Sequence, residues 1–372
     1  MRMLSAWLVL TFLAMCFVIR ASADDDSRDG RLVSVMTQNL DLGATLSGAA
    51  AATTPQELID AVTGIFHAVQ ATSFPERAEA LADEIAAQHP DLIGLQEVAL
   101  WRSQYPADLS PTPNALTVEF DFLQILLDAL AVRGLRYDVV AVVVENDIEG
   151  PADAEGRRCI FPLGFSQGDC RDIRLTDREV ILARADSRGP RLHLSNVQVG
   201  TFANNLTLST LTGVFMAQRG WASVDVQVRG QSFRFITTHL DPDAPLVQVA
   251  QADEIVQGPA HTMLPVLFVC DCNSPADGTG TASYGHLIAA GFEDAWSAQH
   301  PRDPGFTCCE DENLLNSKPT LTERIDLVLF RGDFSVEDVT RVGDAPADRT
   351  PSGLWPSDHA GVVARLWLGH DD

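Results

Sequence analysis

Short apolar runs rich in β-branched residues recur along the whole chain and constrain its fold more than any other sequence feature. Runs of this length and composition are typical of buried β-strands. The predicted strands span 32–37, 91–98, 139–144, 180–183, 193–199, 223–228, 233–238, 266–270, 324–330 and 361–367. Because two packed sheets can bury such strands against each other, we expect a β-sandwich core.

Fewer segments have helical periodicity, and these supply the outer layers. Apolar residues recur at helical spacing over 55–71, and Thr54, Pro55 and Glu57 have the order typical of a helix start. Further helices are predicted near 78–85, 120–131, 246–256 and 284–290. The predicted fold class is α+β, a two-layer β-sandwich flanked by helices in a four-layer α/β/β/α arrangement. With 372 residues, 46% of them hydrophobic, and no internal repeat, the chain can form one large domain over residues 24–372.

The first 23 residues have the composition of an export signal. Arg2 precedes an apolar run over 4–19, and the segment ends in Ala-Ser-Ala at 21–23. A membrane anchor is the alternative, but the run is shorter than the roughly 20 residues that span a bilayer, and Arg20 interrupts it. A lipoprotein signal at Cys16 is weaker, because a small residue is missing before it. We therefore predict a signal peptide over 1–23 and a secreted protein.

The charge balance limits the partners that the protein can take. The formal net charge is −25, and loss of Arg2 and Arg20 with the signal peptide makes it −27. Such a field attracts cations and repels nucleic acid and anionic membranes unless a local basic patch intervenes. No dense basic run occurs in the sequence. No obligate protein partner is indicated, and the apolar face of the 55–71 helix is expected to pack on the core rather than on lipid.

Six cysteines remain after removal of the signal peptide, and export to an oxidising compartment favours disulfides. Cys159 and Cys170 bracket a short polar loop and are predicted to be bridged. The pairing of the others stays open, although disulfides or free thiols are favoured over a zinc site, because adjacent cysteines lack the usual spacing of zinc ligands. This second group is Cys270, Cys272, Cys308 and Cys309.

Polar residues stand where several predicted strands end. One such residue alone is more often a turn former or a helix cap. Together they offer carboxylates, amides and imidazoles without a thiolate cage, a set that suits a hard cation such as Mg²⁺ or Mn²⁺ beside a phosphate. The clusters are Gln38-Asn39, Gln96-Glu97, Thr238-His239, Asp271-Cys272-Asn273, Asp326 and Ser357-Asp358-His359.

In their order along the chain these clusters resemble the motifs of the endonuclease/exonuclease/phosphatase superfamily, which includes deoxyribonucleases, neutral sphingomyelinases and inositol-polyphosphate phosphatases. The resemblance covers nearly the whole chain after the signal peptide. The segments that carry it are Thr37-Gln38-Asn39-Leu40, Leu95-Gln96-Glu97-Val98, Thr238-His239-Leu240, Val269-Cys270-Asp271-Cys272-Asn273-Ser274, Arg324-Ile325-Asp326-Leu327 and Ser357-Asp358-His359.

The resemblance implies a division of roles among these residues. Metal ligands would be Asn39, Glu97 and Asp358, holding Mg²⁺ or Mn²⁺. In the catalytic group, Asp271 would deprotonate the attacking water, and Asn273 would fix the geometry of Asp271. His239 and His359 would bind the non-bridging phosphate oxygens, and Asp326 would orient His359.

Two departures from the family pattern concern the surroundings of the site. Cys270 and Cys272 replace a glycine and an aromatic residue on either side of Asp271. The tyrosine and second glutamate that several nucleases supply from mid-chain have no clear counterpart. Arg178-Glu179 lies near that position, where Arg178 would either contact a phosphate or form a surface ion pair.

The function expected from these features is that of a secreted, metal-dependent phosphoester hydrolase, chiefly a phosphodiesterase, in which water attacks phosphorus. Three alternatives stay open: a secreted nuclease acting on DNA or RNA, a sphingomyelinase-like phospholipid hydrolase, and a noncatalytic binding module on the same fold. The acidic charge and the missing basic run favour a phospholipid head group or a small phosphodiester as substrate over nucleic acid.

Overall fold

The computed structural model describes residues 31–108, 110, 112–154, 157–160, 169–185 and 192–369. The predicted signal peptide at 1–23 lies outside these residues. Among the helices that are described, none has both the length and the apolar character needed to cross a membrane.

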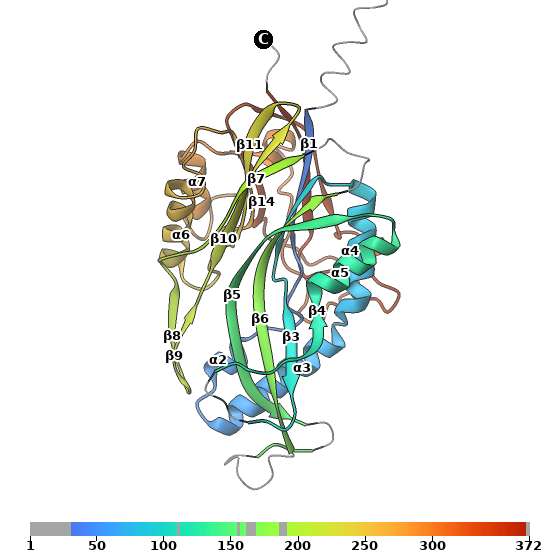
Figure 1. Ribbon diagram of the computed structural model, residues 1–372, viewed down its shortest axis with the longest axis vertical. Helices are drawn as coiled ribbons and strands as arrows, with labels where there is room; N and C mark the ends of the chain where they lie inside the picture. Colours follow the sequence, from blue (N-terminus) through green and yellow to red (C-terminus); the bar gives the residue numbers. More distant parts are fainter. Residues whose placement is uncertain are drawn as a thin grey trace, which may run out of the picture.

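Most of the predicted strands belong to two large mixed sheets (Figure 1). The first sheet has eight strands in the order β15-β16-β1-β2-β6-β3-β4, with β5 also pairing with β6. Within it, β1 is parallel to β2 and antiparallel to β16. The strand bounds are β1 (Leu32–Asn39), β2 (Leu92–Gln96), β3 (Leu100–Gln104), β4 (Thr117–Asp121), β5 (Tyr137–Asp153), β6 (Cys170–Arg184), β15 (Phe334–Val342) and β16 (Gly361–Leu368).

The second sheet has six strands in the order β13-β14-β12-β11-β10-β7, and β11 and β12 in its middle are parallel. A separate two-stranded hairpin, β8 (Leu206–Thr210) and β9 (Gly213–Ala217), connects β7 to β10. The bounds of the six strands are β7 (His193–Thr201), β10 (Gly220–Val228), β11 (Gln231–His239), β12 (Val266–Asp271), β13 (Glu293–Asp294) and β14 (Asp326–Arg331).

The two sheets pack face to face through one apolar core, to which Val35 and Ile181 of the first sheet and Phe235 and Val269 of the second contribute. Gly94 on β2 sets how closely the sheets approach at this point. A Cβ there would lie 2.5 Å from side-chain atoms of Val269, a separation that only glycine avoids. The sheets can therefore bring the ends of their central strands together.

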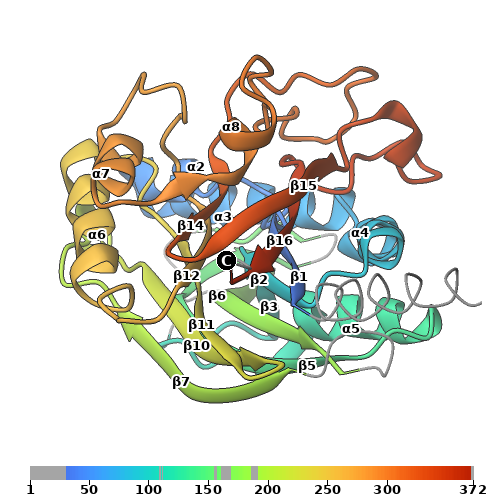
Figure 2. The ribbon, with the colours of Figure 1, turned by 90° about the horizontal axis from the view of Figure 1, so that it is seen from above.

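Helices cover the outer face of each sheet (Figure 2). The first sheet is covered by α3 (Pro55–Ala71), α4 (Phe74–Gln88) and α5 (Phe122–Val132), and the second by α6 (Pro245–Gln257) and α7 (Ser283–Ala289). Shorter helices are α2 (Ser47–Ala51), α8 (Ala295–Gln299) and η2 (Pro346–Asp348). The predicted four-layer α/β/β/α fold class is confirmed.

The start of α3 follows the prediction closely. The Thr54 hydroxyl accepts from the Glu57 amide at 3.2 Å, and the Glu57 carboxylate accepts from the Thr54 amide at 3.2 Å. This reciprocal capping satisfies two amides that the helix itself leaves without partners. The strands at 100–104, 117–121, 206–210, 213–217 and 334–342 were not predicted, because they are short or partly exposed and lack a continuous apolar run.

Candidate active site

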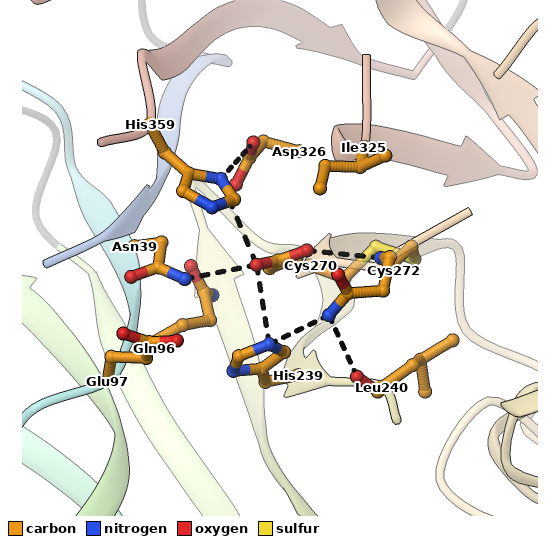
Figure 3. A network of polar contacts seen from close by, with 12 residues as sticks. Asn39, Gln96, Glu97, His239, Leu240, Cys270, Cys272, Ile325, Asp326 and His359 are labelled. Carbon is orange, nitrogen blue, oxygen red and sulfur yellow. Dashed lines mark hydrogen bonds and ion pairs between the residues drawn. A yellow bond between two sulfur atoms is a disulfide. The ribbon is translucent and has the colours of Figure 1, made fainter. Parts of the chain in front are cut away.

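All eight predicted site residues come together where the central strands of both sheets end. Strand β1 ends at Asn39, and its parallel neighbour β2 ends one residue before Glu97. In the second sheet, β11 ends at His239, and its parallel neighbour β12 ends at Asp271. Asp326 begins the antiparallel neighbour β14 and lies opposite Asp271. Asn273 follows β12, and Asp358 and His359 precede β16. Figure 3 shows side chains from both sheets pointing toward a common centre.

Asp271 lies at that centre and is buried. Its Oδ2 accepts from Asn39 Nδ2 at 3.0 Å, and its Oδ1 accepts from the backbone amide of Asn273 at 3.1 Å. Burial and the nearby charge of Asp326 raise the pKa of Asp271 to about 6. A carboxylate with a pKa near neutrality can take a proton from water more effectively than an ordinary aspartate.

His359 is paired with Asp326 through a 2.8 Å contact between Nδ1 and Oδ2. Burial alone disfavours a charged imidazole, but Asp326, Asp358 and Asp271 raise the pKa of His359 well above its usual value. These three carboxylates therefore favour the imidazolium form of His359. Because Nδ1 is occupied by Asp326, its Nε2 hydrogen can be donated to a phosphate oxygen.

His239 lies on the other side of Asp271, with 3.3 Å between His239 Nε2 and Asp271 Oδ2. Each of its ring nitrogens also faces a donor group: Arg219 Nη1 lies 3.1 Å from Nδ1, and Asn273 Nδ2 lies 2.9 Å from Nε2. Burial, together with the charges of Arg219 and His359, lowers the pKa of His239 well below its usual value. The surroundings of the two histidines thus shift their pKa values in opposite directions.

A buried charged cluster behind His239 was not identified from the sequence. Arg219 Nη1 donates to Glu145 at 2.8 Å and lies 3.8 Å from Asp177. Glu179 lies 3.9 Å from His239 Nδ1, and both of its carboxylate oxygens lack a hydrogen-bond partner. Burial, followed by the charges of Glu145 and Asp177, raises the pKa of Glu179 well above its usual value.

Among these residues only Glu179 had a sequence signal, its place near the expected mid-chain glutamate. The contacts of the neighbouring residue Arg178 contradict both predictions made for Arg178. Its Nε donates to the Val98 carbonyl at 2.8 Å and its Nη2 to Asp121 at 2.6 Å. Arg178 is buried and holds the start of β3 in place, so it is neither a phosphate contact nor a partner of its sequence neighbours.

Glu97 and Asp358 form the negative side of the site. Burial, together with the charge of Asp358, raises the pKa of Glu97 to about 8. Burial, together with the charge of Asp41, raises the pKa of Asp358 to about 7. The Glu97 carboxylate also accepts a hydrogen bond from the Leu42 amide at 2.8 Å. When burial and neighbouring carboxylates raise the pKa of a carboxylate in this way, its ionised form is disfavoured, and a bound divalent cation would favour that form.

Arg77, which is fully buried on α4, ties together the loop after Asn39 and the loop that carries Asp358. It donates to the carbonyls of Leu40 at 2.7 Å, Asp41 at 3.0 Å and Pro356 at 3.0 Å. One loop follows Asn39 and the other precedes Asp358. Since a buried guanidinium needs its hydrogen bonds satisfied, the three carbonyls and Arg77 hold one another in place.

The cysteine pairs are resolved by the structure. The predicted Cys159–Cys170 disulfide is confirmed. Cys270 and Cys272 are bridged to each other around Asp271, and Cys308 is bridged to Cys309. These pairings agree with the preference for disulfides over a zinc site.

We expect the metal-free protein to lose stability as the pH rises from about 6 to about 8. In the folded protein the pKa is about 6 for Asp271, about 7 for Asp358 and about 8 for Glu97. In the unfolded chain these carboxyl groups have pKa values near 4. The folded state therefore binds more protons in this range, and stability falls with pH. Thermal melts in a chelator across this range measure the effect, and added Mg²⁺ should stabilise most at the high end. A melting temperature that rises with pH in the chelator contradicts the assignment.

The sequence profile of the Endonuclease/Exonuclease/phosphatase family matches residues 36–359. No curated protein matches the chain at a significant level of sequence similarity.

Several solved structures share the fold. An endonuclease/exonuclease/phosphatase family protein from Bacteroides thetaiotaomicron aligns with a TM-score of 0.54 and 15% identity over 91% of this chain and 98% of that chain. TDP2 from D. rerio, complexed with a single-strand DNA product, aligns with a TM-score of 0.52 and 16% identity over 90% and 98%. A mannosyl-6-phosphatase from Bacteroides thetaiotaomicron aligns with a TM-score of 0.50 and 17% identity over 90% and 99%. At these identities the likeness shows the fold alone.

Proposed function

The chain belongs to the endonuclease/exonuclease/phosphatase family, whose members hydrolyse phosphoester bonds. On that premise we propose that it is a divalent-metal-dependent phosphodiesterase that acts outside the cytoplasm. The observation that carries the proposal is the placement of Asp271 between two buried histidines, 3.9 Å from His359 Nδ1 and 3.3 Å from His239 Nε2, whose surroundings shift their pKa values in opposite directions. This arrangement suits a centre where a proton is removed on one side while negative charge develops on phosphate oxygens.

The residues fit a divalent cation. Glu97 and Asp358 supply carboxylate oxygens whose pKa values are raised even though the nearby charge of His359 acts against the rise, and Asn39 lies beside Glu97. A hard cation such as Mg²⁺ or Mn²⁺ prefers such oxygen ligands. When bound, it would neutralise phosphoryl oxygens and stabilise the leaving oxygen.

The remaining residues carry the proton transfers. Asp271, oriented by the Asn39 amide and the Asn273 backbone amide, takes a proton from the attacking water. The water oxygen forms a bond to phosphorus, the bond from phosphorus to the leaving oxygen breaks, and the leaving oxygen departs as an alcohol after taking a proton from solvent water. His359 donates a hydrogen bond to a non-bridging oxygen as charge develops there, and Asp326 fixes the orientation of the ring.

The substrate class follows from charge. TDP2 is described in complex with DNA, yet this chain has a net charge of −25 and no dense basic run. A nuclease must bind a polyanion against this field. A phosphodiester with little net charge, such as a zwitterionic lipid head group or a small soluble diester, is favoured. The signal-like segment at 1–23 and the disulfides support action in an oxidising, extracytoplasmic compartment.

A substrate panel tests the proposal. Turnover of DNA, RNA, sphingomyelin, inositol phosphates and a chromogenic phosphodiester should be measured with a chelator and with Mg²⁺ or Mn²⁺. We expect chelation to abolish turnover and either cation to restore it. A Cys308→Ser/Cys309→Ser variant should retain its metal dependence, because these residues are not ligands. Metal-independent turnover, or no turnover of any substrate, would refute the proposal.

A further inference from the structure

Two segments that flank the site contain no charged residue at all. They span 42–56 and 192–218. Because 21% of the residues in this chain are charged, uncharged runs of this length on the surface are a departure from its composition. The first segment includes α2, and the second includes β7 and the β8–β9 hairpin.

Both segments start or end at the active site. The first begins at Leu42, whose amide donates to Glu97 at 2.8 Å. The second ends immediately before Arg219, whose amide donates to Asn205 at the base of the hairpin at 2.9 Å. In Figure 1 the hairpin extends away from the second sheet toward α2, and β8 contacts α2. The two uncharged segments therefore contact each other, and Arg219, which follows the second segment, lies 3.1 Å from His239 Nδ1 of the site through its Nη1.

The hairpin exposes large apolar side chains. Val214 is 77% exposed and Met216 is 50% exposed. They are two residues apart on β9 and so share one face of the hairpin. Leu211, in the turn, is 40% exposed. We name these three residues the hairpin surface. Nothing in the described part of the chain covers it.

Charge indicates the occupant of the hairpin surface. With a net charge of −25 the protein is repelled by nucleic acid and by anionic lipid. An uncharged apolar projection beside the site matches a surface that has no net charge and an apolar interior. A bilayer of zwitterionic phospholipid has both properties, and apolar side chains insert at its interface.

We propose that the hairpin surface docks the enzyme onto zwitterionic phospholipid, so that the phosphodiester delivered to Asp271 belongs to a lipid head group. This proposal rests on the phosphodiesterase function proposed above. The hairpin enters the interface, and the adjoining uncharged α2 segment allows the acidic protein to approach the bilayer without placing a charge against the lipid.

Vesicle flotation with the full-length exported protein tests the docking. The probe is a vesicle of pure phosphatidylcholine, and a second set replaces part of this lipid with phosphatidylserine. The test variant is Val214→Glu/Met216→Glu. The matched control is Val132→Glu/Met263→Glu, which adds the same charge at positions that are 81% and 100% exposed, at the end of α5 and in the loop before β12.

We expect the unmodified protein and the control to float with phosphatidylcholine vesicles and the hairpin variant to lose at least about tenfold in binding, because two charges would have to enter the interface with it. Phosphatidylserine should weaken binding of the unmodified protein. All three proteins should hydrolyse a soluble chromogenic phosphodiester equally. Only hydrolysis of vesicle lipid should fall in the hairpin variant.

Other outcomes separate the two proposals. Equal vesicle binding by the hairpin variant and the control overturns the docking proposal. The docking proposal is also overturned if the unmodified protein binds DNA or phosphatidylserine vesicles more tightly than phosphatidylcholine vesicles and the hairpin variant loses that binding. A dimer in sedimentation that the hairpin variant converts to monomer, without vesicle binding, identifies a second copy of the chain as the occupant. Vesicle binding without turnover of the soluble diester refutes the proposed function and leaves the docking intact.

Discussion

Replacement of Asp271 by asparagine is expected to lower kcat by about 10² to 10⁴-fold, the usual cost of losing a general base. The asparagine side chain has nearly the same shape but cannot accept the proton from water. Metal binding should persist, because this change leaves the carboxylates of Glu97 and Asp358, the proposed ligands, in place.

The measurement combines a rate assay with thermal melts across a Mg²⁺ titration. The control is Asp277→Asn, the same chemical change at an exposed aspartate six positions along the chain, which should leave kcat unchanged. Near-normal rates for Asp271→Asn would show that another group removes the proton. Loss of the Mg²⁺-dependent melting shift in this variant would mean that Asp271 is itself a ligand.

Replacement of Glu97 by glutamine should abolish the stabilisation that Mg²⁺ gives the folded protein, and turnover should fall with it. A cation present at 100 times its dissociation constant stabilises the folded state by about 2.7 kcal/mol. Removing a charged ligand weakens the affinity and removes most of that shift. In the chelator the variant should instead be at least as stable as the unmodified protein at high pH, because it lacks a buried carboxyl whose pKa is raised to about 8.

The control for Glu97 is Glu84→Gln. Glu84 is also buried, both of its carboxylate oxygens lack a partner, and burial raises its pKa well above the usual value. It should therefore be neutral already, and its replacement should change neither the Mg²⁺-dependent melting shift nor the rate. An equal loss of the Mg²⁺ shift in both variants would show that the effect comes from a disturbed core and would remove Glu97 from the metal site.

The sequence predicted which residues gather at the candidate site because each of them stands at or near a strand end. Asn39, His239 and Asp271 each occupy the last position of an apolar strand. The alternation between buried strand and polar terminus is local, so it can be recognised without knowing the topology. Glu145 and Arg219 carry no such signal. Glu145 lies in the middle of β5 and Arg219 lies between β9 and β10, and their pairing depends on how the two sheets approach each other.

The sequence by itself determined the family, the fold class, the capped start of α3 and the set of polar residues that meet at the ends of the central strands, since all of these follow from local patterns and from their order along the chain. Only the tertiary structure decided the direction in which the pKa of each histidine shifts. Both are buried, and burial alone would lower both pKa values. The pKa of His359 is raised instead because Asp326, Asp358 and Asp271 surround it, whereas burial and the facing Arg219 both lower the pKa of His239. Electrostatic interactions act through space, and the neighbours of a residue in space are fixed only when the chain has folded.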